Sequence, residues 1–175
     1  MNFERLIGIL TKSQDDTMVQ DIVRYDSIKR LFRMTLDSNS NSHILLTGPP
    51  ASAKTMFLMS LLQHLKNSYF VDGGNATKTG LIDYLFENQP RYLLIDEIDK
   101  SVPKHQTFLL NLMETGIISE TKYGKIRQTR INTSIFATSN DTRKLSAALL
   151  SRYFIVELEP YTHEQFDEIT ARLLE

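Results

Sequence analysis

The sequence predicts an α/β fold: a three-layer sandwich in which helices cover both faces of a five-stranded parallel sheet, with a small hairpin before the fourth core strand. Short apolar runs alternate along the chain with segments in which apolar residues recur at helical spacing. The runs are continuous, which is typical of strands that are covered on both faces. Ligands bind such sheets outside the carboxyl ends of the strands, so the residues that follow each run are the candidate functional residues.

Composition and charge describe a single globular domain. The 175 residues include 20 basic and 21 acidic side chains, for a formal net charge of −1. This balance gives no global attraction for nucleic acid or for a membrane surface. The absence of cysteine excludes a disulfide framework and a thiolate metal site. No apolar run is long enough to span a membrane, and we expect a cytoplasmic protein with no membrane partner.

Helices are expected where apolar residues recur every three or four positions between capping or turn-forming residues. Asp26 is the expected N-cap of the first core helix, and Gly116 is expected to end a later one. A capping box opens at Thr162. The expected helices cover residues 2–11, 27–36, 55–66, the stretch after Gly74 up to about 87, 102–114, 145–150, and 162 onward.

Strands are expected at the continuous apolar runs, each bounded by turn-forming residues. Residues 117–131 alternate loosely about Tyr123-Gly124, which predicts the hairpin. The expected core strands cover residues 43–46, 68–72, the run from 92 to the acids at 96 and 97, 133–138, and 153–158.

Between the first strand and the next helix lies the loop Gly48-Pro-Pro-Ala-Ser-Ala-Lys54-Thr55. A strand, a tight loop that ends in Lys-Thr and a helix form the context of a phosphate-binding loop, or P-loop. Consecutive backbone N–H groups at a helix N-terminus make an anion site. Lys54 would reach the β- and γ-phosphates of a nucleotide, and the Thr55 hydroxyl would ligate Mg²⁺. The residues expected to bind the nucleotide are Gly48, Pro50, Ala51, Ser52, Ala53, Lys54 and Thr55.

Two alanines depart from the usual pattern of this loop, G-x-x-x-x-G-K-[ST]. Ala53 stands where the second glycine is usual, and Ala51 replaces a glycine that is common in Gly-Pro-Pro-Gly versions. Glycine serves such loops through its tolerance of positive φ and its lack of a Cβ. Taken alone, the stretch also fits an ordinary strand-turn-helix.

Polar residues follow the later strands at the same edge of the sheet. Asp96 would hold Mg²⁺ mainly through water, and Glu97 would polarise the attacking water. The Asn140 amide can orient that water, with a turn-capping role as the alternative. Arg152 suits either a salt bridge to an acid such as Asp141 or a contact with a γ-phosphate.

In this order and spacing, the motifs resemble the core of an AAA+ ATPase, over about residues 18–170. The motifs are the P-loop, Leu93-Leu-Ile-Asp-Glu97, Ala137-Thr-Ser-Asn140 and Leu149-Leu-Ser-Arg152. The resemblance implies binding and hydrolysis of ATP with Mg²⁺ in a hexameric ring of identical subunits. The matching positions are Lys54 and Thr55 for Walker A, Asp96 and Glu97 for Walker B, Asn140 for sensor 1, Arg152 for the arginine finger that serves a neighbouring subunit, and Ile22 and Val23 beside the adenine ring.

Two branches of this superfamily share further features with the chain. The segment Leu112-Met-Glu-Thr-Gly116, the hairpin and the pair Arg152-Tyr153 resemble the Holliday-junction branch-migration motor. The alanine before Lys54 and the Leu-Leu-Ser-Arg ending resemble minichromosome-maintenance helicases. The resemblance therefore implies a DNA-associated motor. Two alternatives stay open: a protein-remodelling ATPase, and a nucleotide-dependent switch or assembly module with little turnover.

The resemblance also divides the chain. Residues 1–20 form a lead-in segment, residues 21–161 the nucleotide-binding core, and residues 162–175 the start of a helical lid that is otherwise absent. Such a lid normally carries a sensor 2 arginine, so its absence bears on how fast the isolated chain turns over.

The hairpin segment 122–130 carries four cations and no acid: Lys122, Lys125, Arg127 and Arg130. Such cations can follow a phosphate backbone, and Tyr123 can stack on a base. These five residues are the candidate DNA contacts. The alternative is an exposed hairpin whose charge discourages aggregation.

Overall fold

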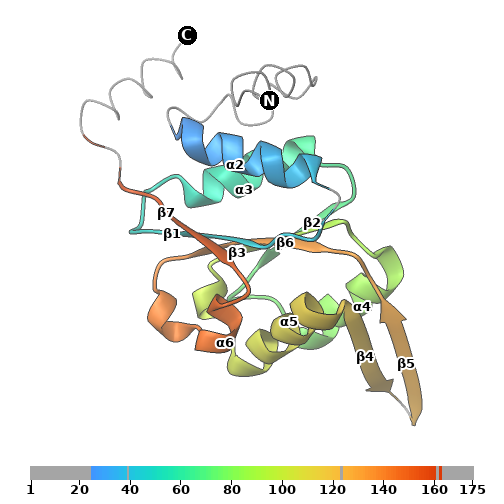
Figure 1. Cartoon of the computed structure of the whole chain (residues 1–175). Coiled ribbons are helices and arrows are strands. Elements are labelled where there is room, and N and C mark those ends of the chain that lie inside the picture. Colours follow the sequence, from blue (N-terminus) through green and yellow to red (C-terminus); the bar gives the residue numbers. More distant parts are fainter. Residues whose placement is uncertain (1–24, 39, 123, 161, 163–175) are drawn as a thin grey trace.

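The computed structural model describes residues 25–38, 40–122, 124–160 and 162. The core strands are β1 (Ile44–Thr47), β2 (Ser68–Asp72), β3 (Tyr92–Asp96), β6 (Ser134–Ser139) and β7 (Phe154–Glu157). They form one parallel sheet in the order β2-β3-β6-β1-β7, which confirms the predicted fold class (Figure 1). The predictions on residues 2–11 and on the helix after residue 162 lie outside the described residues.

Helices cover both faces of the sheet, as Figure 1 shows. They are α2 (Asp26–Asp37), α3 (Lys54–His64), α4 (Lys78–Asn88), α5 (Pro103–Thr115) and α6 (Ala147–Leu150), with short 3-10 helices η1 (Ile98–Lys100) and η2 (Thr142–Lys144). In one core cluster, α2 and α3 pack on one face; in a second cluster, α4, α5 and α6 pack on the other. Among the described residues, no helix has the length and apolar character needed to cross a membrane.

The interior strand β1 shows why its sequence is continuously apolar. Ile44 and Leu46 pack with α2 and α3, whereas Leu45 packs with the helices of the opposite face, as the two-residue period of a strand requires. All four residues of β1 are buried, and the strand lies between β6 and β7. The P-loop therefore begins at the end of a buried interior strand.

The expected N-cap of α2 is wrong by one residue. Tyr25 is the N-cap, in the left-handed region at φ 59°, and Asp26 is already helical. The backbone carbonyl of Tyr25 accepts from the amides of Ile28 and Lys29. Asp26 lies instead in the first turn, where the helix dipole favours a negative charge, and its carboxylate is 3.6 Å from Lys29 Nζ.

The hairpin lies beside the sheet and is not part of it. Its strands β4 (Ile117–Lys122) and β5 (Lys125–Arg130) pair antiparallel with each other. Gly116 ends α5 in the left-handed region at φ 67°, as predicted; a Cβ there would lie 2.8 Å from the carbonyl oxygen of Ile131. Ile118 is fully buried, whereas Ile126 is 76% exposed. The base of the hairpin is thus anchored in the core, and the outer part is open to solvent.

Candidate nucleotide site at the sheet edge

The P-loop keeps a glycine-like backbone although it carries two alanines. Ala51 and Ala53 both lie in the left-handed region, at φ 63° and φ 60°. Ala53 is the N-cap of α3, so the backbone turns into the helix as a glycine would allow at lower cost. Gly48 has no such substitute, because at φ 146° a Cβ would lie 2.3 Å from the carbonyl oxygen of Leu158.

Lys54 is folded back into its own loop. Its Nζ donates to the carbonyl oxygens of Gly48 and Pro49, at 2.8 and 2.6 Å, and to Ser52 Oγ at 3.0 Å. Burial lowers the pKa of Lys54, although the nearby Asp96 and other acids act in the opposite direction. The ammonium group thus sits beside the N-terminus of α3, where an anion would bind.

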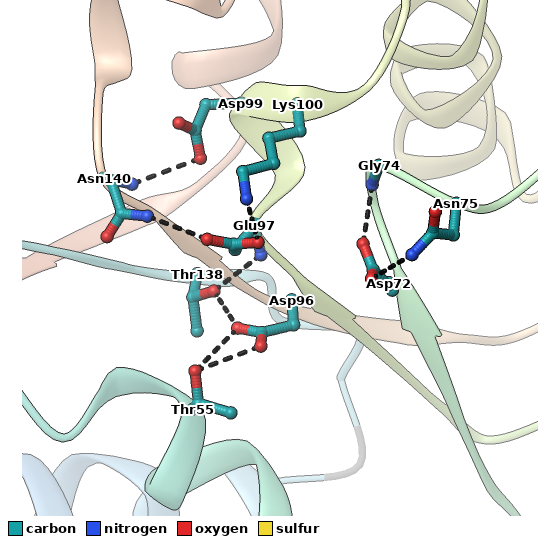
Figure 2. A network of polar contacts seen from close by, with 10 residues as sticks. All are labelled: Thr55, Asp72, Gly74, Asn75, Asp96, Glu97, Asp99, Lys100, Thr138 and Asn140. Carbon is teal, nitrogen blue, oxygen red and sulfur yellow. Dashed lines mark hydrogen bonds and ion pairs between the residues drawn. The ribbon is translucent and has the colours of Figure 1, made fainter. Parts of the chain in front are cut away.

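Asp96, the acid that ends β3, is held between the hydroxyl groups of Thr55 and Thr138 (Figure 2). Thr55 Oγ1 donates to the Asp96 carboxylate at 3.0 and 3.1 Å. Thr138, at the end of β6, also donates to Asp96, and its hydroxyl accepts from the backbone N–H of Glu97 at 2.8 Å. These contacts fix the positions of both acids relative to the P-loop helix.

Glu97 is bonded from two sides. Asn140 Nδ2 donates to its Oε1 at 3.2 Å, and Lys100 Nζ donates to its Oε2 at 2.6 Å (Figure 2). The Asn140 backbone N–H in turn donates to Asp99 at 3.2 Å. Glu97 itself is in the left-handed region at φ 51°, a conformation that is uncommon for a residue with a Cβ. The backbone thus leaves the regular β conformation at Glu97, the residue that follows β3.

These groups line one pocket of about 410 Å³. Its walls are residues 50–56 of the P-loop and α3, the two acids that end β3, Thr138 and Asn140. The volume falls within the range of small-molecule sites. The sheet therefore brings residues 50–55 of the predicted P-loop together with the predicted residues that follow the two later strands; Gly48 is not among the described residues that line the pocket.

The oxygen donors in this pocket suit Mg²⁺. The Thr55 hydroxyl and the Asp96 carboxylate already lie within hydrogen-bond distance of each other. Mg²⁺ prefers oxygen ligands and keeps several of its waters, so one hydroxyl and one nearby carboxylate are enough when a substrate supplies phosphate oxygens. Thr55 and Asp96 are the residues that could hold it.

A comparison with known families identifies the domain. The family model described as "ATPase family associated with various cellular activities (AAA)" matches residues 44–161, which is more than half of the chain. The chain belongs to this family. It is thus a P-loop ATPase domain, and ATP is the nucleotide that the family implies.

A relative of this AAA domain is the DNA replication licensing factor MCM4 of Drosophila melanogaster. The two are 27% identical over 148 aligned residues, which cover 68% of this chain and 17% of the relative. The chain thus spans less than a fifth of that protein's length. The family and this relative confirm the predicted AAA+ core and its similarity to minichromosome-maintenance proteins. The similarity to the branch-migration motor stays a prediction.

Arg152 of the AAA domain lies elsewhere. It is not among the described residues that line the pocket, and its guanidinium contacts Glu114. The alternative considered from sequence, a salt bridge to an acid, is therefore present. The acid is Glu114 and not the example Asp141, which is held by Arg143, two residues away. Ile22 and Val23, expected beside the adenine, lie outside the described residues.

The cations of the hairpin are not equivalent. Arg127 donates to Glu120 and to Asp83 of α4, and its guanidinium lies 4.4 Å from the Phe86 ring centroid. Arg130 is exposed at the end of β5. Lys122 and Lys125 are backbone partners in the register of β4 and β5, and Tyr123 lies outside the described residues. Arg127 thus ties the hairpin to α4.

Sequence reasoning gave no role to Thr138 and Lys100, which hold the two acids. Thr138 stands two residues before Asn140 on a strand that pairs with β3, and this adjacency was a usable signal. Lys100 follows Glu97 by three residues, a spacing that a one-turn 3-10 helix brings together. Its role depends on that turn, which the sequence pattern did not predict.

Proposed function

We propose that this AAA domain hydrolyses ATP with the help of Mg²⁺, as one subunit of a ring-shaped motor that acts on DNA. The observation that carries the proposal is the position of Glu97. Its carboxylate is held by Asn140 in the same pocket as the P-loop. A carboxylate and an amide placed there can orient a water toward the γ-phosphate.

In the proposed reaction, Lys54 and the N–H groups at the start of α3 bind the β- and γ-phosphates. Mg²⁺, held by Thr55 and mainly through water by Asp96, would neutralise negative charge on both phosphates. Glu97 and Asn140 position the attacking water, and Glu97 accepts its proton. The water oxygen bonds to the γ-phosphorus as the bond to the β–γ bridging oxygen breaks, which yields ADP and inorganic phosphate.

The proposal requires assembly because no arginine is among the described residues that line the pocket. Phosphoryl transfer needs a cation near the leaving charge, and Arg152 lies outside the pocket of its own chain. We assign it to the site of the next subunit in a hexameric ring.

The proposed division of the chain has residues 21–161 as the core, with Ile22 and Val23 beside the adenine. Residues 1–20 are a lead-in, and residues 162–175 are the start of a lid. The cytoplasmic location is likewise part of the proposal.

The DNA assignment rests on the relative and on the hairpin. The relative is a DNA replication licensing factor, and the hairpin of β4 and β5 extends away from the sheet (Figure 1). Its strands carry Lys122, Lys125 and Arg130. These three cations and Tyr123 are the proposed contacts, because Arg127 is already neutralised by two acids.

The ATPase assignment is tested by calorimetry with Mg·ATP and by phosphate release. We expect wild type to bind and hydrolyse ATP, Glu97→Gln to bind without hydrolysis, and Lys54→Ala to lose binding. Removal of Mg²⁺ with a chelator should stop phosphate release. Binding without turnover at any protein concentration would favour the switch, and absence of binding would show that Ala51 and Ala53 have disabled the loop.

The DNA assignment is tested by titration of fluorescent single-stranded and branched DNA at several salt concentrations. Lys122→Ala/Lys125→Ala/Arg130→Ala should weaken binding at least tenfold and flatten the salt dependence, because about three phosphate contacts are lost. The matched control is Lys66→Ala/Lys78→Ala/Lys104→Ala, which removes the same charge outside the hairpin. Equal loss in both triple variants, or no DNA binding by wild type, would favour the protein-remodelling alternative.

A further inference from the structure

Glu114 lies where a negative charge is unfavourable, unless a cation such as that of Arg152 balances it. It lies in the last turn of α5, at the negative end of the helix dipole, where a carboxylate is destabilising. The segment 112–115 contains no basic residue. The cation that balances it is Arg152, 38 residues later in the chain.

The contact between them is made by one side of the guanidinium. Arg152 Nε and Nη2 both donate to Glu114 Oε1, at 3.1 and 2.5 Å. A guanidinium has five N–H bonds in one plane, and this arrangement uses only the pair along the Nε–Nη2 side. Both N–H bonds of Nη1 and one of Nη2 are left for another acceptor, and together they form the end-on fork that suits a phosphate.

Both backbones that carry this pair are fixed by the core. Arg152 lies between Leu149 and Tyr153, which are both buried, and its N–H donates to the Leu149 carbonyl at 3.1 Å. The last turn of α5 is closed by the Gly116 N–H, which donates to the Leu112 carbonyl at 2.9 Å. Because the two ends are fixed, the carboxylate restricts a side chain that would otherwise sample many rotamers.

We propose that Glu114 is a positioning residue for Arg152, holding its guanidinium so that the end-on fork reaches the γ-phosphate of ATP in the neighbouring subunit. This inference rests on the proposed function, since it assumes that Arg152 acts in trans. Glu114 contacts no substrate. It acts by reducing the conformational freedom of Arg152 before the next subunit's ATP arrives.

The experiment measures phosphate release over a range of Mg·ATP concentrations for wild type, Glu114→Ala, Glu114→Gln, Arg152→Ala and the double variant Glu114→Ala/Arg152→Ala. Glu114→Ala should lower kcat by about 10- to 100-fold, as small misplacements of a reacting group do, with KM and ATP affinity nearly unchanged. Glu114→Gln retains an acceptor oxygen and should recover much of the rate. The double variant should match Arg152→Ala alone. Glu87→Ala, an acid at the end of α4, is the control and should behave as wild type.

Three results would overturn the inference while the ATPase assignment stands. Glu114→Ala could leave kcat unchanged, could raise it (the carboxylate then withholds Arg152), or could lower it equally in the Arg152→Ala background. If Glu114→Ala fails to fold or to bind ATP, Glu114→Met decides, because it keeps the side-chain volume but removes both acceptor oxygens. Glu114→Met must then lower kcat with KM nearly unchanged, or the inference falls. Wild type without hydrolysis would instead contradict the proposed function itself.

Discussion

The nucleotide site at the carboxyl ends of β3 and β6 (the edge, below) and the β4–β5 hairpin are both polar, but the protein holds them in different ways. At the edge, Asp96 is the last residue of β3 and Thr138 the last but one of β6, two strands whose interior residues are buried, and they bond to each other across the adjacent strands. In the described part of the chain, the two hairpin strands pair only with each other, and Arg127 links them to α4. Local opening costs less free energy where few buried contacts are lost. The edge is thus built to hold reacting groups in place, and the hairpin is built to adjust to what it contacts.

The largest expected effect tests whether the nucleotide site can work without Arg152 of a neighbouring subunit. Arg152→Ala should lower the rate of phosphate release roughly 1,000-fold, as loss of an arginine finger does, with ATP binding retained. Mixing it with Lys54→Ala should restore part of the rate, because each variant supplies what the other lacks in a shared site. A mixture no faster than its components would place Arg152 outside catalysis in trans.

Thr138→Val tests how far the edge depends on one buried hydroxyl. The variant keeps the shape of the side chain but leaves the Glu97 N–H without its acceptor, which costs about 1–3 kcal/mol. We expect a loss of stability of that size in urea unfolding and a slower hydrolysis by at least tenfold. Thr129→Val makes the same change in the hairpin and should leave hydrolysis unchanged. Equal effects of the two would remove the distinction between the regions.

Mild acid should weaken the sheet that supports the edge. The His43 ring is neutral where its Nδ1 accepts from the Ile135 N–H at 3.1 Å, and burial lowers its pKa from 6.5 to about 4. Between these values the unfolded chain binds a proton that the folded chain does not, so stability falls as pH drops from 6.5 to 4. The loss approaches 3 kcal/mol, from about 1.4 kcal/mol per pH unit.

The measurement is the free energy of unfolding between pH 4 and 7. His43→Gln, which cannot titrate, should lack the part of the slope that lies between pH 4 and 6.5. The hypothesis fails if the variant and wild type have the same slope.

Arg127→Leu should loosen the hairpin and leave the edge intact. The side chain is partly exposed, so solvent screens its ion pairs, and we expect only a small loss of stability. Hydrogen exchange should accelerate at the amides of β4 and β5 and remain unchanged at β3 and β6. Faster exchange in both regions would mean that the hairpin supports the sheet.

The smallest expected effect concerns the exposed alanine of the P-loop. Ala51→Gly removes the penalty of a left-handed alanine and should raise stability by up to about 1 kcal/mol, less the greater entropy of glycine in the unfolded chain. Ala148→Gly, in helix α6, should instead lower stability by about the same amount. Thermal unfolding of both variants checks the sign at each position.

The sequence was informative where one physical rule determines the local structure. Continuous apolar runs predicted the core strands, and the carboxyl-end rule predicted that Lys54, Asp96 and Asn140 would meet. The rule gave no partner for Arg152, because the pairing with Glu114 depends on how α5 and α6 pack across 38 residues of chain. The sequence pattern also gave no sign of the ion pair between Arg127 and Asp83, since Asp83 belongs to a different element, α4. Contacts of this kind follow from the tertiary packing.

The absence of a side chain at Gly48 has a mechanical consequence. Leu158 lies so close that its carbonyl would meet any Cβ at 2.3 Å, and its N–H donates to Thr47, the last residue of β1, at 2.7 Å. The end of the last core strand is therefore coupled directly to the first residue of the P-loop. We expect a displacement of Leu158 to be felt at Gly48, and a displacement of Gly48 to be felt at the end of β7, because the two backbones are in contact.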